Sequence, residues 1–116
     1  MRGYYFITDS GLSLSGNVAD VKAALAAGVT VVQYREKNRS SREMYREALQ
    51  LRELCLGSGA LFIVNDRVDI ALAVDADGVH LGQDDMPYAA ARRILGAGRV
   101  IGVSVSTIGE EIGRAH

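Results

Sequence analysis

Five short segments of the chain are rich in apolar residues that follow one another with little polar alternation. Such runs are typical of strands buried on both faces, as in a parallel sheet covered by helices. Glycine or polar residues bound the runs, which fits short strands separated by loops. The pattern predicts strands over residues 4–8, 29–33, 61–64, 79–81 and 100–105.

Between these strands, apolar residues recur at helical spacing, and several boundaries carry residues typical of helix ends. Asn17 is the expected N-cap of the first helix, which Gly28 ends. Ser40 and Glu43 form a capping box for the second helix. The predicted helices are residues 18–27, the stretch from the capping box to residue 56, a short apolar segment from Val68, residues 88–95 after Pro87, and a last segment beginning at Thr107.

Strand and helix alternate five times with short loops, which predicts an α/β fold with a parallel sheet. No dinucleotide-binding glycine fingerprint and no phosphate-loop lysine motif follows any predicted strand. Their absence favours a parallel (β/α) barrel of the TIM type over a doubly wound nucleotide-binding sheet. With 116 residues, the chain is expected to form a single domain, residues 1–116.

Composition narrows the classes of function. The formal net charge of −1 argues against a general binder of nucleic acid or of membrane surfaces, which would carry a basic excess. No apolar run approaches the about 20 residues of a membrane span, and the N-terminus lacks a signal-peptide pattern. The single cysteine, Cys55, lies in an apolar helical pattern, so we expect a core thiol and a cytoplasmic protein.

The end of the second predicted strand carries a strip of polar side chains. In barrel-type α/β proteins, function lies at the carboxyl ends of the strands. Because side chains alternate faces along a strand, Gln33, Arg35 and Lys37 share one face, and Tyr34 and Glu36 the other. One amide and two cations make a plausible clamp for a phosphate or diphosphate. The alternative is a strand end in solvent, with Arg35 paired to Glu36 or to Asp9.

Asp66 and Asp85 follow the third and fourth predicted strands. If these strands are parallel neighbours, their axes lie about 4.8 Å apart, and both carboxylates reach the same edge of the sheet. Two carboxylates so placed repel each other unless a cation lies between them, which suggests a site for Mg²⁺. The alternative is that Asp66 caps the following helix and Asp85 decorates the start of the next one.

Two further side chains lie at the predicted strand ends. Ser104 follows Gly102, whose lack of a side chain lets a neighbour come close, and its hydroxyl is available to a ligand. His80 is expected to be a buried, hydrogen-bonded histidine. No nucleophile with an assignable base is present, so no catalytic residue is assigned. The combination suggests a site that binds a diphosphate through Mg²⁺ and stabilises it as it departs.

Three blocks of the sequence resemble the thiamine phosphate synthase family: GVTVVQYREK, LFIVNDRVDIALAVDADGVHLGQDD and VIGVSVS. The resemblance implies a (β/α)8 barrel and a transferase that joins hydroxymethylpyrimidine diphosphate to thiazole phosphate, releasing diphosphate with the aid of Mg²⁺. It also implies roles for single residues. By this resemblance, Gln33, Arg35, Lys37, Asn65 and Ser104 bind the pyrimidine diphosphate, and Asp66 and Asp85 hold Mg²⁺.

The family's later blocks, which bind the thiazole phosphate, do not occur in this sequence. About five of the eight strand–helix units of a barrel are present, so we expect the N-terminal portion of a synthase, inactive alone. Its first and fifth strands would leave open sheet edges, through which we expect self-association. The alternatives are a thiazole tautomerase-like relative, which tends to lose the second aspartate, or a non-catalytic half-barrel that binds a phosphorylated ligand.

Overall fold

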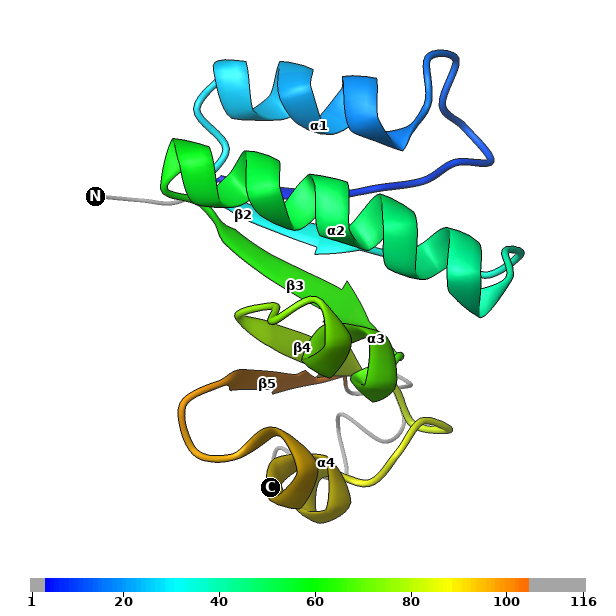
Figure 1. Cartoon of the computed structure of the whole chain (residues 1–116), viewed down its shortest axis with the longest axis vertical. Helices are drawn as coiled ribbons and strands as arrows, with labels where there is room; N and C mark the ends of the chain where they lie inside the picture. The colour runs from blue at the N-terminus through cyan, green and yellow to red at the C-terminus, as the bar shows by residue number, and fades with distance from the viewer. Residues whose placement is uncertain (1–3, 105–116) are drawn as a thin grey trace, which may run out of the picture.

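The computed structural model describes residues 4–104 of the chain, in which five parallel strands alternate with four helices (Figure 1). The strands pair in the order β1-β2-β3-β4-β5. In chain order the elements are β1 (Tyr5–Ile7), α1 (Asn17–Ala26), β2 (Val31–Tyr34), α2 (Ser41–Ser58), β3 (Leu61–Asn65), α3 (Val68–Ala73), β4 (Gly78–Leu81), α4 (Tyr88–Leu95) and β5 (Val100–Val103).

The strand order confirms the predicted barrel plan. Each strand pairs with the next one along the chain, and every pair is parallel. A doubly wound sheet would reverse direction at an internal strand, whereas a barrel sector runs in sequence. The predicted strands differ from the observed ones by one or two residues at their ends. The predicted helix from Thr107 and the predicted strand residue Val105 lie outside the described residues.

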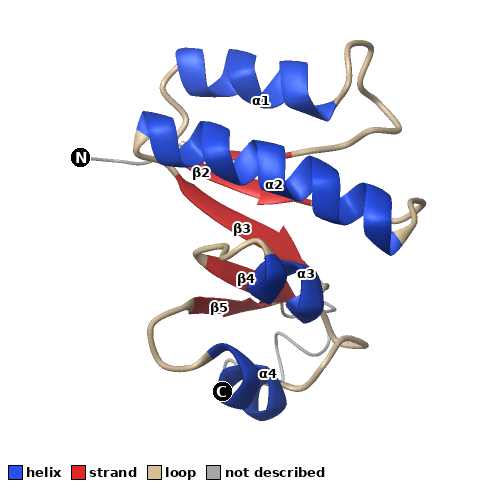
Figure 2. Cartoon of the chain, in the orientation of Figure 1, coloured by secondary structure: helices blue, strands red, loops and turns tan. Residues whose placement is uncertain are grey.

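The helices gather on one side of the sheet (Figure 2). Their apolar residues and the strand residues that face them form one buried cluster, in which Tyr34, Phe62, Leu51 and Leu81 are among the largest buried side chains. Cys55 belongs to this cluster, as predicted, and burial raises the pKa of its thiol to about 11. The core therefore lies between the sheet and the helices.

The other face of the sheet is apolar but open. Side chains of the edge strands are about half exposed there, as Tyr5 at 55 % and Val100 at 53 % show. A hollow of about 200 Å³ lies on this face, between Tyr5 and Gly102. In a closed barrel, this face would be packed as the interior.

The second helix begins as predicted. The Ser40 hydroxyl accepts from the backbone N–H of Glu43, and the Glu43 carboxylate accepts from the Ser40 N–H. Gly59, at φ 74°, ends the helix in the left-handed conformation that favours glycine. This helix packs against β3 and, through the Tyr34 hydroxyl and Glu47, against the end of β2.

The prediction that Asn17 caps the first helix is wrong. Gly16 occupies the N-cap position, and no side chain caps this helix. Asn17 is buried, and its amide donates to the carboxylates of Glu36 and Glu47 at 3.2 and 3.1 Å. Charged acceptors, of which Glu36 is buried and Glu47 partly buried, form strong hydrogen bonds with this amide, which therefore does not cap the helix.

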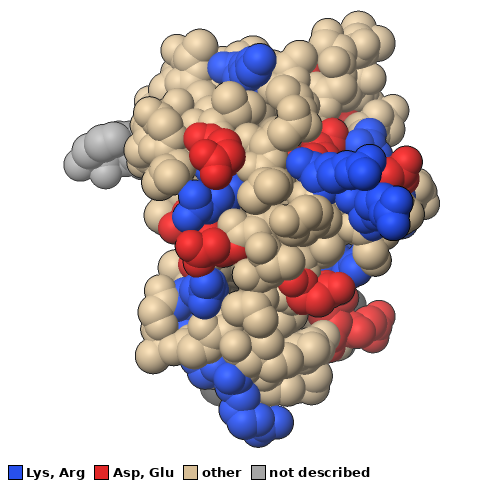
Figure 3. All heavy atoms as spheres, in the orientation of Figure 1, with Lys and Arg blue, Asp and Glu red and all other residues tan. Residues whose placement is uncertain are grey.

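Cations and carboxylates are intermixed on the visible face of the molecule (Figure 3). Several of them form pairs, such as Arg39 with Glu47 at 2.7 Å and Arg52 with Asp75 at 3.1 Å. Within residues 4–104, the helices are too short or too polar to cross a membrane.

Candidate functional site

The alternation along β2 divides its end as predicted. Gln33, only 4 % exposed, faces the open side of the sheet, whereas Tyr34 lies under α2 and its hydroxyl donates to Glu47 at 2.8 Å. Glu36 is buried on the same side as Tyr34, and Arg39 lies 3.7 Å from its carboxylate. The alternative pairing of Arg35 with Glu36 or Asp9 is not among the ion pairs of the described residues. The Arg35 side chain is exposed at the end of the strand.

Hydrogen bonds connect polar side chains of β1, β2 and β3 in a row across the open face. The Gln33 amide donates to the Tyr5 hydroxyl at 2.8 Å, and its carbonyl accepts from Asn65 at 2.9 Å. The Asn65 carbonyl in turn accepts from the Lys37 ammonium at 3.3 Å. The row fixes which way both amides point, since each has one defined donor and one defined acceptor contact. Tyr5 was missed from the sequence, because only the strand register brings it to Gln33.

Thr8 ties the end of β2 to β1. This residue is buried, and its hydroxyl accepts from the Arg35 backbone N–H at 3.0 Å while donating to the Arg35 carbonyl at 3.4 Å. The backbone of Arg35 is thus held while its side chain stays in solvent. A small hollow beside it is lined by the loop after β1 and by Arg35 and Lys37. The lining also includes Asp9 and Glu36, so acidic and basic residues are mixed in its walls.

Asp66 and Asp85 interact with each other where β3 and β4 end, and the interaction shifts the pKa of both carboxyls. Partial burial, with hydrogen bonding to and repulsion from Asp85, raises the pKa of Asp66. The Gly82 backbone N–H, which donates to Asp85 Oδ2 at 2.6 Å, lowers the pKa of Asp85, and the contact with Asp66 adds to this. Lys37 lies 3.7 Å from Asp66 and partly offsets the repulsion.

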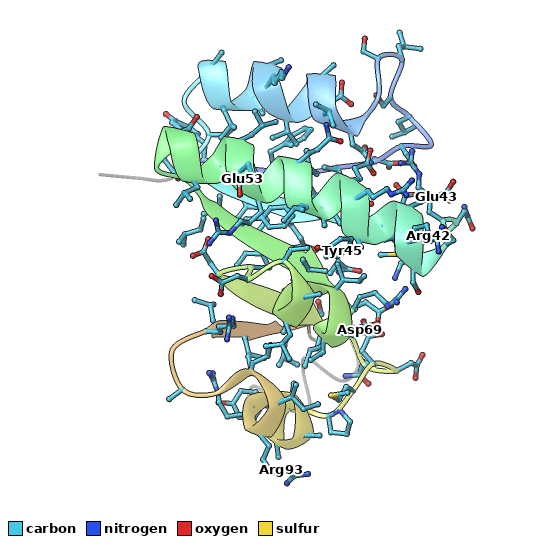
Figure 4. The ribbon with its side chains drawn as sticks, viewed as in Figure 1. Arg42, Glu43, Tyr45, Glu53, Asp69 and Arg93 are labelled. Atoms are coloured by element: carbon cyan, nitrogen blue, oxygen red, sulfur yellow. The ribbon has the colours of Figure 1, made fainter. Side chains whose placement is uncertain are left out.

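The alternative role of Asp66 as a helix cap is wrong. Arg67 occupies the N-cap of α3, with no side-chain cap, and its guanidinium pairs with Asp69 at 2.8 Å, in the first turn (Figure 4). Asp66 itself has φ 76°, which non-glycine residues rarely adopt. Backbone strain of this kind often occurs at functional sites. The Asp66 carboxylate interacts with Lys37 and Asp85 at the carboxyl ends of the strands rather than with the end of the helix.

The two carboxylates at these strand ends are ligands that fit Mg²⁺ bound together with a phosphate. Residues 4–104 contain no group of three or more His, Cys, Asp or Glu side chains arranged to hold a metal ion. Mg²⁺, however, is commonly bound by one or two carboxylates, with substrate phosphates and waters completing the octahedron. Asp66 and Asp85 supply two carboxylates whose mutual repulsion a divalent cation would relieve.

Asp66→Asn is expected to raise the free energy of unfolding near neutral pH, by only about 0.5 kcal/mol because the site is partly exposed. A carboxyl with a raised folded-state pKa favours folding when protonated and loses that contribution as the pH rises through the raised pKa. Asparagine removes the repulsion and tolerates positive φ. In urea unfolding, the difference should vanish once the pH falls below the ordinary pKa of aspartate. A variant less stable than the unsubstituted chain at neutral pH would contradict the repulsion.

Ser104 follows β5, at the same end of the strands, and its hydroxyl is hydrogen-bonded to His80 Nε2. The predicted hydrogen-bonded state of His80 is confirmed, although the residue is half-buried rather than buried. The group that approaches Gly102 is the His80 ring.

The seven residues assigned to the site from the sequence all lie at or near the carboxyl ends of the strands. They are Gln33, Arg35, Lys37, Asn65, Asp66, Asp85 and Ser104.

The fold and this edge define a class: a TIM-type parallel (β/α) protein with its polar side chains gathered at the carboxyl ends of the strands. The chain belongs to the thiamine monophosphate synthase family, whose model matches residues 4–116. The predicted family is thereby confirmed.

Individual relatives agree. The chain is 54% identical over 103 residues to a thiamine-phosphate synthase of Methanosarcina barkeri, covering 89% of this chain and 46% of that protein. It is 55% identical over 109 residues to one of Chloroflexus aurantiacus, covering 93% and 50%. A solved thiamine phosphate pyrophosphorylase from Pyrococcus furiosus superposes with a TM-score of 0.85 at 45% identity, covering 97% of this chain and 55% of that one. The chain therefore spans about half the length of the relatives it matches.

Proposed function

We propose that the chain carries the part of a thiamine phosphate synthase that binds hydroxymethylpyrimidine diphosphate. In the proposed transferase reaction, the pyrimidine's methylene carbon loses its bond to diphosphate and gains one to thiazole phosphate, giving thiamine phosphate. The small-molecule substrates are thus a pyrimidine diphosphate and a thiazole phosphate, and the proposed location is the cytoplasm. The observation that best supports this function is the placement of two cations, two amides and two carboxylates along one edge of the sheet.

Each side chain has a proposed task. Arg35, exposed at its strand end, offers a fork that matches two phosphate oxygens, and Lys37 adds a point charge. The fixed amides of Gln33 and Asn65 and the Ser104 hydroxyl orient the pyrimidine diphosphate. Asp66 and Asp85 would hold Mg²⁺, which when bound neutralises charge on the departing diphosphate. No side chain is assigned as nucleophile or base, because the reaction depends on orientation and charge stabilisation.

Calorimetric titration of the chain with either substrate separates the candidate functions. We expect Mg²⁺-dependent binding of hydroxymethylpyrimidine diphosphate, with thiazole phosphate binding more weakly. Binding of thiazole phosphate alone, independent of Mg²⁺, would favour a tautomerase-like relative instead. The presence of Asp85 beside Asp66 favours the synthase, since the tautomerase-like relatives tend to lose this second carboxylate. Binding of both ligands that does not depend on Mg²⁺ would favour a non-catalytic ligand-binding half-barrel.

We also infer that the chain associates with itself. In the described sheet, β1 and β5 each pair on one side only, and the face opposite the helices exposes apolar side chains such as Tyr5, Ile7 and Val100. Unpaired strand edges next to an apolar face favour pairing with another chain. Light scattering is expected to give a mass of at least a dimer, increasing with concentration. A monomer of 12.4 kDa that unfolds cooperatively at all concentrations would contradict the inference.

A further inference from the structure

His80 has no task in the proposed function, yet it lies between two parts of the candidate site. In the sheet register it is paired with Asn65 on β3 and with Gly102 on β5. Its backbone carbonyl accepts the N–H of Asp66 at 2.8 Å, while its side chain extends in the other direction to Ser104. One residue therefore contacts the backbone of a proposed metal ligand and the hydroxyl of a proposed substrate ligand.

Gly102 explains how the imidazole reaches Ser104. A Cβ atom at residue 102 would lie 2.9 Å from His80 Nδ1 and 3.6 Å from its Cε1, so the ring lies against the place a side chain would fill. The first distance is shorter than real Cβ contacts allow. Because residue 102 is glycine, the ring can cross β5 at this level and bring Nε2 to the hydroxyl two residues further on.

Ser104 is held by β4 at two points. Its backbone N–H donates to the carbonyl of Leu81 at 2.9 Å, and its hydroxyl is bonded to His80. A serine side chain has three staggered rotamers, and its hydroxyl has one donor and two acceptor sites. The imidazole bond selects one rotamer and occupies one of these sites. The remaining donor or acceptor sites of the Ser104 hydroxyl are then held in fixed directions.

We propose that His80 is a positioning residue that orients the Ser104 hydroxyl toward the pyrimidine diphosphate, with Gly102 making room for its ring. The inference rests on the proposed function, since it assigns Ser104 to that ligand. His80 acts through Ser104 and does not contact the ligand. Pre-orientation of the hydroxyl lowers the entropy lost on binding, so the expected effect is on affinity.

The test compares variants that differ in reach, by calorimetric titration with hydroxymethylpyrimidine diphosphate and Mg²⁺. Ser104→Ala should weaken binding about three- to tenfold, the typical value of one hydrogen bond. His80→Asn and Gly102→Ala should weaken it to a similar extent, because asparagine is too short and the alanine methyl displaces the ring. His80→Gln, whose amide reaches about as far as Nε2, should recover most of the affinity. His80→Asn combined with Ser104→Ala should lose no more than Ser104→Ala alone.

Arg93→Gln is the control, because this side chain points away from the fold on α4 (Figure 4), and urea unfolding of every variant measures stability. Equal losses in His80→Asn and His80→Gln, or additive losses in the double variant, would overturn the positioning role. Full affinity in His80→Asn beside a loss in Ser104→Ala would also overturn it, while leaving the proposed function in place. No binding by the unsubstituted chain would instead contradict the proposed function, and with it this inference.

Discussion

Asp85→Asn is expected to lower the affinity for Mg²⁺, measured with the pyrimidine diphosphate present, by about tenfold or more. Asparagine keeps the shape of the side chain but removes one of two charges that would face the cation. The fold should be nearly unaffected, because Asp85 is a partly exposed residue at the edge of the sheet. Titration calorimetry at several Mg²⁺ concentrations gives the affinity, and urea unfolding gives the stability.

The matched control for this substitution is Asp75→Asn. Asp75 is also an aspartate in a loop between a helix and a strand, but it lies at the opposite ends of the strands, where it pairs with Arg52 and Arg99. It should leave the Mg²⁺ dependence unchanged. If Asp85→Asn also left that dependence unchanged, the assignment of the carboxylate pair to a metal would be wrong.

Arg35→Ala is expected to weaken binding of the pyrimidine diphosphate by about 10- to 100-fold, since a hydrogen bond to a charged group contributes about 1.5–3 kcal/mol. The loss should be greatest at low ionic strength, where charge pairing is least screened. Arg35→Lys should recover only part of the affinity, because an ammonium cannot replace the planar fork. Titrations at two salt concentrations measure both effects.

The face assignment of β2 is tested by the same titrations. Lys37→Ala should also weaken binding, whereas Glu36→Gln should not, because Glu36 lies on the helix side of the strand with Ser10 and Asn17. A larger loss of affinity from Glu36→Gln than from Arg35→Ala would mean that the diphosphate lies on the other face.

Local signals in the sequence were sufficient for much of this architecture. The unbroken apolar runs located all five strands, and the capping box of Ser40 and Glu43 located the start of α2. The alternation along β2 separated Gln33 from Tyr34 correctly, because one face of a strand follows from spacing alone. The carboxylates Asp66 and Asp85 could be brought together because parallel neighbouring strands end at one edge.

The side-chain contacts that could not be predicted from the sequence join residues that lie far apart along the chain. Asn17 has the residue type of a helix cap, but its amide donates hydrogen bonds to the carboxylates of Glu36 and Glu47. These two residues belong to other parts of the fold. The contact of Tyr5 with Gln33 depends on the register of β1 against β2. A local propensity is overridden wherever a buried group finds a better partner elsewhere in the fold.

The contact between His80 and Ser104 likewise joins two strands. The sequence shows a histidine in one strand and a glycine two residues before a serine in another, without indicating that they meet. Only the register that places His80 opposite Gly102 makes the glycine necessary. Close approaches between strands are therefore the part of the site that a single sequence leaves out.

The proposed function requires that the carboxyl ends of these strands bind a divalent cation together with a diphosphate. A crystal structure of the chain with Mn²⁺ in place of Mg²⁺ and with hydroxymethylpyrimidine diphosphate tests it most directly, because anomalous scattering locates the manganese. We predict one anomalous peak between the carboxylates of Asp66 and Asp85, with the diphosphate against Arg35 and Lys37. Manganese bound instead at the opposite ends of the strands, near Asp75, or diphosphate bound without contact to Arg35 or Lys37, would contradict the account.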